Sequence, residues 1–129
     1  MESRSDIARE KKMSGQYNCA QAVACTYSDI VGADEAVVRD VTAAFGTGMG
    51  NMEGTCGALV GAGVILGMAI KDRVAARAVM KRVMSDFASV TGGATTCRCL
   101  KGIGTGTPVL DCNDCVSLAA TLLERNMPH

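Results

Sequence analysis

Cysteine is the residue type that could perform chemistry in this chain of 129 residues. The seven cysteines are Cys19, Cys25, Cys56, Cys97, Cys99, Cys112 and Cys115. The single histidine, His129, is the last residue, so imidazole contributes little to a metal or redox site. A thiol in the first turn of a helix is stabilised as thiolate by the helix dipole and by unpaired N–H groups. Four cysteines stand at expected helix starts or beside glycines, namely Cys19, Cys56, Cys97 and Cys112.

The N-terminal segment indicates the compartment in which these thiols act. Residues 1–12 are charged and contain no apolar stretch of signal-peptide length, which predicts a cytoplasmic protein. In a reducing compartment, thiols serve more often as metal ligands, catalytic groups or core residues than as permanent disulfides. An odd number of cysteines also cannot pair completely within one chain. We therefore expect metal ligands or reversible thiols rather than a disulfide framework.

Composition predicts the fold class that must position the thiols. Hydrophobic residues make up 48% of the chain but aromatic residues only 3%, so the core must be aliphatic and closely packed. Such a core suits helices that meet through small residues, and no window alternates apolar and polar residues as a strand would. We expect one all-α domain over residues 1–129. The 13 acidic and 13 basic residues leave no net charge, so nucleic acid is not an expected partner.

Glycines and capping residues divide the chain into about five or six helices. A charged helix or arm is expected within residues 1–13, and further helices over residues 17–31, 34–45, 55–70 and 72–90. The expected N-caps of the last three are Asp34, Thr55 and Asp72. The last helix is expected to begin at Asp111 or Asn113 and to end near Arg125. Two segments are expected to be irregular: the glycine-rich connector 46–50 and the Cys- and Gly-rich loop 94–111.

Residues 54–70 contain no charge and could be read as a membrane span or as a core helix. The segment is shorter than the hydrocarbon layer of about 30 Å requires, and Glu53 and Lys71 close it on both sides. A helix that is apolar all round must be surrounded, so we expect a buried, Gly-rich central helix and no membrane insertion. Apolar helix surface would remain to be covered, which predicts a symmetric homodimer.

Three kinds of cofactor site can be compared with the motifs. Residues 46–50 lack the strand and the Gly-Lys-Ser/Thr sequence of a phosphate-binding loop. Covalent haem requires Cys-x-x-Cys-His, but Val116 follows Cys115, so no haem is expected. Zinc stays open as an all-thiolate site, although it would leave Cys19 and Cys56 unexplained. Its ligands would be Cys97, Cys99, Cys112 and Cys115.

The remaining cysteines have simpler interpretations. Cys25 lies six residues after Cys19, roughly 120° away around a helix, and is expected to be a buried small hydrophobe. Cys99 and Cys115 are either accessory thiols or bystanders. Met80 and Met84 have the spacing of a core stripe, and a basic helix face could dock an acidic electron-transfer partner. That face consists of Lys71, Arg73, Arg77, Lys81 and Arg82.

The order of the motifs carries a resemblance. The motifs are Asn18-Cys19, Phe45-Gly46-x-Gly48-Met49, Cys56-Gly57-Ala58-x-x-Gly61, Cys97-Arg98 and Cys112. From about residue 15 to 124 the chain resembles the redox-active proteins labelled C_GCAxxG_C_C. The resemblance implies an α-helical domain for electron transfer or thiol redox chemistry that uses the four motif cysteines. The domain is also similar to the non-haem part of split-Soret cytochrome c, a dimer associated with an iron–sulfur centre.

We therefore expect a redox protein, an oxidoreductase or an electron carrier, that works with an unidentified electron donor or acceptor protein. Its four motif cysteines would either hold an iron–sulfur cluster, with [2Fe–2S] favoured, or form a reversible thiol–disulfide set. Gly48 and Gly57 are the expected cofactor-contacting glycines. In the dithiol mechanism Cys56 is the expected attacking thiolate, because its glycine-rich surroundings should leave it accessible. A zinc- or other metal-binding module without turnover is the alternative.

Overall fold

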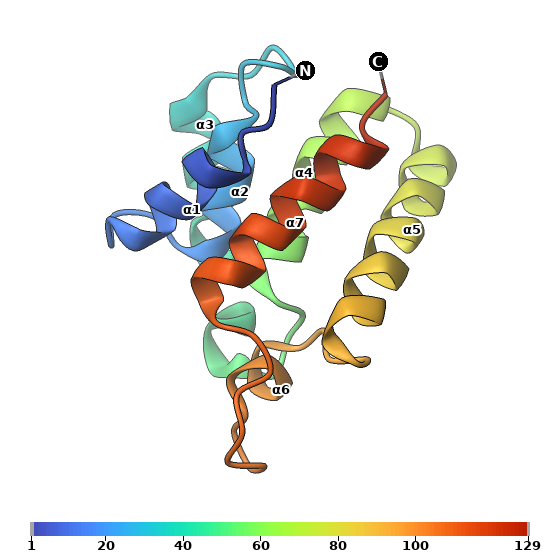
Figure 1. Ribbon diagram of the computed structural model, residues 1–129. Coiled ribbons are helices and arrows are strands. Elements are labelled where there is room, and N and C mark those ends of the chain that lie inside the picture. Colours follow the sequence, from blue (N-terminus) through green and yellow to red (C-terminus); the bar gives the residue numbers. More distant parts are fainter. Residues whose placement is uncertain (1, 129) are drawn as a thin grey trace.

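The computed structural model describes residues 2–128, and this part of the chain is all-α, as predicted (Figure 1). Its helices are α1 (Ser5–Met13), α2 (Cys19–Thr26), α3 (Glu35–Val41), η1 (Ala43–Phe45), η2 (Gly48–Met52), α4 (Gly57–Ile70), α5 (Arg73–Thr91), α6 (Cys97–Lys101) and α7 (Cys112–Asn126). Both labelled chain ends lie at one end of the bundle, whereas α6 and the first turns of α4 and α7 lie at the other.

Helix α4 lies among α2, α5 and α7 and contributes Leu59, Ile65 and Leu66 to the core. A Cβ built at Gly61 would lie 2.5 Å from the carbonyl oxygen of Ala20, so glycine lets the backbones of α2 and α4 meet directly. The helix is not enclosed on every side, because Gly67 is exposed. Helix α4 also begins later than expected, at Gly57.

The expected cap of α4 was wrong. Cys56, not Thr55, is the N-cap residue, and Thr55 instead forms an isolated antiparallel bridge with Thr96. The bridge holds the segment before α4 against the segment before α6. The tertiary contact of Thr55 therefore outweighs its local preference for the N-cap position of α4.

Helices α2 and α3 are both shorter than predicted. A capping box between Asn18 and Gln21 starts α2 at Cys19. The helix ends at Thr26, and its C-cap residue, Tyr27, is fully buried and donates a hydrogen bond from its hydroxyl to Glu124 of α7. Helix α3 has the predicted Asp34 cap but ends at Val41, and the 3₁₀ turn η1 replaces its last expected turn.

The two segments expected to be irregular contain only short turns. In the connector, the η2 turn is not a regular helix, because Met49 (φ 65°) and Gly50 (φ 85°) have non-helical backbone angles. The loop 94–111 contains α6, which begins where the Thr96 hydroxyl accepts a hydrogen bond from the Cys99 N–H at 3.3 Å. Both turns stand beside the first residues of α4 and α7, so the irregular sequence builds the cysteine-bearing end of the bundle.

Helix α1 is an integral part of the domain rather than a loose arm. It packs along α7, with Ala8 fully buried. The Arg4 N–H donates to Glu124 at 2.6 Å, and the Arg9 guanidinium donates to Asp114 at 3.3 Å. These contacts set the position of Lys12, near the end of α1, relative to the beginning of α7.

The other surface features agree in part with the sequence. Met80 and Met84 are half-buried against the core, and the five basic residues from Lys71 to Arg82 are exposed. None of the helices within residues 2–128 is both long and apolar enough to cross a membrane. His129 lies outside the described residues.

Candidate functional site

A cavity of about 70 Å³ lies at the end of the bundle where α2, α4, α6 and α7 begin. Five cysteines line it: Cys19, Cys56, Cys97, Cys112 and Cys115. All five are free thiols, and only Cys112 is more than slightly exposed. The four motif cysteines are thus brought together, and Cys115 joins them.

Local structure explains how four chain segments meet at this cavity. Cys19, Cys97 and Cys112 are each the first residue of a helix, and Cys56 is the residue before one. The Cys56 N–H donates to the Thr95 carbonyl at 2.8 Å. The Cys97 N–H donates to the Gly54 carbonyl at 3.1 Å. These two backbone hydrogen bonds hold Cys56 and Cys97 at neighbouring positions.

Gly48 and Gly57 also line the cavity, and their lack of a side chain is a steric requirement. A Cβ at Gly48 (φ +54°) would lie 2.5 Å from the Cβ of Cys97. A Cβ at Gly57 would lie 2.7 Å from the Phe45 carbonyl oxygen and 3.3 Å from the Cβ of Cys19. The two glycines therefore allow the cysteines to approach, and their contact with a cofactor stays a prediction.

The thiols of Cys19 and Cys112 form the first contact pair. A hydrogen bond from Cys19, supported by the nearby ammonium groups of Lys101 and Lys12, lowers the pKa of Cys112 to about 6. The same hydrogen bond and burial raise the pKa of Cys19, because Cys19 retains the shared proton. The pair therefore consists of a thiolate at neutral pH and a thiol that stabilises it.

Cys56 and Cys115 form a second contact pair. A hydrogen bond from Cys115 lowers the pKa of Cys56, and the backbone N–H groups of Ala58 and Leu59 lower it further. The pKa of Cys115 is raised by this hydrogen bond and by burial. Cys56 is only 5% exposed, so the expected steric access of this residue was wrong. The glycines next to Cys56 allow other backbone segments to pack closely, so they leave no open space around its thiol.

Cys97 stands apart from both pairs although it lines the same cavity. Burial is the main cause that raises its pKa, and the charges of Cys112 and Cys56 act in the same direction. Its Cβ faces the backbone of Gly48. Cys97 is therefore best described as a buried thiol adjacent to two coupled pairs.

The other two cysteines lie outside the cavity. Cys99 is exposed on α6, and Cys25 is buried elsewhere on α2 with its sulfur 4.0 Å from the Glu35 carbonyl oxygen. Cys25 therefore occupies the core position that its helical spacing predicted. Cys99 does not line the cavity with Cys97, Cys112 and Cys115, and the zinc ligand set of these four residues stays a prediction.

The cavity thiols are the candidate ligands of a metal ion or cluster. Within residues 2–128, no three cysteine, histidine or carboxylate side chains converge as ligands of one metal. The five thiols come from chain segments that meet at one small cavity. Their use as iron–sulfur ligands stays a prediction, beside pairwise thiol chemistry.

Two features of the cavity were missed or left undecided by sequence reasoning. Lys12 carried no local signal, because it reaches the cavity only through the packing of α1 on α7. Cys115 had a signal in its spacing of three residues from Cys112, which places both on the same side of a helix. No carboxylate from the described part of the chain lines the cavity, so the two lysines bias it towards thiolate.

Comparison with known families agrees with this description. A family model described as "Putative redox-active protein (C_GCAxxG_C_C)" matches residues 17–126, which include every cavity cysteine. No curated protein and no solved structure showed a significant match to the chain. Because the family model covers most of the sequence, the chain belongs to the C_GCAxxG_C_C family of redox-active proteins.

Proposed function

We propose that this protein is a thiol–disulfide redox protein whose reactive pair is Cys19 and Cys112. One observation carries the proposal: Cys19 and Cys112 line the same small cavity, and Cys112 is the cavity cysteine that is only half-buried. An attacking thiol needs thiolate character, access and a neighbouring thiol that completes the exchange. Cys112 has the first two properties, and Cys19 supplies the third.

The reaction consists of two exchanges with a disulfide of a small molecule or partner protein. The Cys112 thiolate attacks one sulfur of that disulfide and releases the other sulfur as a thiol, after protonation. Cys19 then loses its proton and attacks the Cys112 sulfur of the mixed disulfide. The products are the Cys19–Cys112 disulfide and a fully reduced substrate, which has received two electrons and two protons.

The surroundings of the pair support this direction of attack. Lys12 and Lys101 lower the pKa of Cys112, whereas the pKa of Cys19 is raised. Cys112 is also the first residue of α7, where the helix dipole favours negative charge. Cys112 therefore replaces Cys56 as the proposed attacking residue.

Alkylation and peptide mapping test the proposal. Reduced protein is equilibrated anaerobically with mixtures of oxidised and reduced dithiothreitol, its free thiols are alkylated, and its peptides are mapped. The expected product contains a Cys19–Cys112 disulfide, which is absent in Cys112→Ser and retained in Cys99→Ser. Wild-type protein that never forms this bond would contradict the proposal.

The same preparation distinguishes the alternatives that the sequence left open. Iron with acid-labile sulfide in anaerobically purified protein would favour a cluster, and stoichiometric zinc would favour a metal-binding module. A symmetric homodimer stays a prediction, which light scattering tests against the chain mass of 13.3 kDa. The cytoplasmic location and the electron-transfer partner also stay predictions.

A further inference from the structure

The proposed reaction leaves a second pair of buried thiols in the same cavity unused. Cys56 is 5% exposed and Cys115 2% exposed, so both thiols are buried. Both residues line the cavity that contains Cys19 and Cys112. Cys115 is not one of the four cysteines in the family motif, so the motif does not account for its position.

We infer that Cys56 and Cys115 form a second disulfide that is oxidised through the Cys19–Cys112 pair, so that one cavity stores four electrons. The inference rests on the proposed function, because the second pair receives its oxidising equivalents from the first. Its own basis is the placement of Cys56 and Cys115, two buried cysteines from different segments, in one small cavity with Cys19 and Cys112.

Rigid elements hold the two pairs beside each other. Cys112 and Cys115 are three residues apart on α7, so they project from neighbouring positions of one helix face. Their partners begin α2 and precede α4, two helices that pack directly against each other. Each pair therefore joins α7 to one helix of the same packed unit.

The two pairs differ in how accessible they are to a partner protein, and this difference gives them different roles. A partner protein's disulfide cannot enter a cavity of about 70 Å³ to reach Cys56, whereas Cys112 is half-buried at its mouth. Cys112 lies close enough to Cys56 for its negative charge to oppose the lowering of the Cys56 pKa. Oxidation of the inner pair is therefore expected to pass through Cys112.

The internal exchange balances without a further reagent. The Cys56 thiolate attacks the Cys112 sulfur of the Cys19–Cys112 disulfide, and Cys19 leaves as a thiolate that takes up a proton. Cys115 then loses its proton and attacks Cys56, which releases the Cys112 thiolate. The inner pair has lost two electrons and the outer pair has gained them. A second external disulfide reoxidises the outer pair.

The experiment counts thiols in protein oxidised with excess oxidised dithiothreitol. After alkylation and intact-mass measurement, wild-type protein is expected to retain three of its seven thiols. Peptide mapping should identify the Cys19–Cys112 and Cys56–Cys115 bonds, and the inner bond should appear later in a time course. Cys115→Ser should retain four free thiols, form only the outer bond and accept two electrons fewer.

Two further variants complete the design. Cys56→Ser should also form only the outer bond, with Cys115 alkylated, and Cys99→Ser should form both bonds. Wild-type protein with five free thiols and only the Cys19–Cys112 bond would overturn this inference and leave the proposed function intact. A Cys112–Cys115 bond within α7 in place of the Cys56–Cys115 bond would also overturn it. Seven alkylated thiols in oxidised wild-type protein would overturn the proposed function itself.

Discussion

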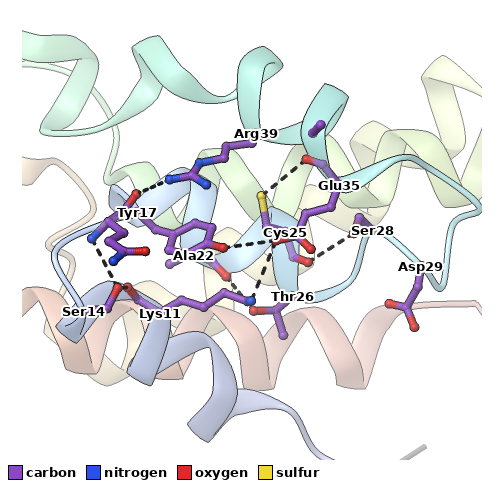
Figure 2. A network of polar contacts seen from close by, with 12 residues as sticks. Lys11, Ser14, Tyr17, Ala22, Cys25, Thr26, Ser28, Asp29, Glu35 and Arg39 are labelled. Carbon is purple, nitrogen blue, oxygen red and sulfur yellow. Dashed lines mark hydrogen bonds and ion pairs between the residues drawn. The ribbon is translucent and has the colours of Figure 1, made fainter.

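Helix α2 carries two buried cysteines in two chemically different regions, and each has a lysine of α1 nearby. Cys19, at the start of α2, lies in the thiol cavity with Lys12. Cys25, in the last turn, lies beside Glu35 and Lys11 (Figure 2). Both cysteines are buried, belong to the same helix and have a lysine nearby. The comparison between them therefore isolates what makes a buried thiol reactive.

The two regions differ in the groups that surround each thiol. Lys11 is already engaged by Glu35 at 3.9 Å and lies 5.0 Å from the centre of the Tyr17 ring. Burial and the Glu35 charge together raise the pKa of Cys25. In the cavity, by contrast, one thiol donates a hydrogen bond to another, and the pKa of Cys112 falls to about 6. Burial alone makes a thiol inert, whereas burial beside a second thiol makes one partner a thiolate.

The largest expected effect is the difference in alkylation rate between the two regions. At pH 7 Cys112 should react with iodoacetamide about 100-fold faster than Cys25, because thiolate is the nucleophile and most of Cys112 is thiolate at that pH. The rate of Cys112 should fall as the pH drops below about 6 and reach a plateau above it. Peptide-resolved mass spectrometry of the reduced protein measures both rates, and equal rates would contradict the comparison.

The next effect concerns the α2–α4 packing that positions Cys19 and Cys56. Gly61→Leu should destabilise the fold by about 1–3 kcal/mol, since its Cβ alone would collide with the Ala20 carbonyl. Gly67→Ala is the matched control on the same helix, where no described atom outside that helix lies within 4 Å of a built Cβ. It should stabilise the fold by about 0.5–1 kcal/mol. Thermal unfolding measures both changes, and unchanged stability of Gly61→Leu would refute the close approach.

A smaller effect is expected when the hydrogen-bond donor of the first pair is removed. Cys19→Ala should raise the pKa of Cys112 towards the ordinary thiol value and slow its alkylation at pH 7 by about 10-fold. Cys25→Ala should leave the Cys112 rate unchanged. If both variants behave alike, then the lysines and the helix dipole, rather than Cys19, produce the thiolate.

This comparison also shows how far sequence reasoning could reach. The all-α class, the Asp72 cap of α5 and the convergence of the four motif cysteines follow from local patterns and motif order. The pairing of thiols does not, because it depends on how α7 packs against α2 and α4. For the same reason Cys56 was expected to be accessible. Glycine next to a cysteine indicates close approach as often as open space, and only the tertiary structure distinguishes the two.

The smallest expected effect separates the two neighbouring lysines. Lys12→Met should raise the pKa of Cys112 and slow its alkylation at pH 7 by about two- to threefold, because the Lys12 ammonium is only half-buried and water weakens its interaction with the thiolate. Lys11→Met should have no effect on Cys112, since Lys11 pairs with Glu35 at 3.9 Å and does not line the cavity (Figure 2). The Lys12 effect should shrink further at high salt, where charges at the cavity mouth are screened. Equal slowing by both substitutions would show that the net charge of α1, and not the placement of Lys12 in the cavity, controls the Cys112 thiolate.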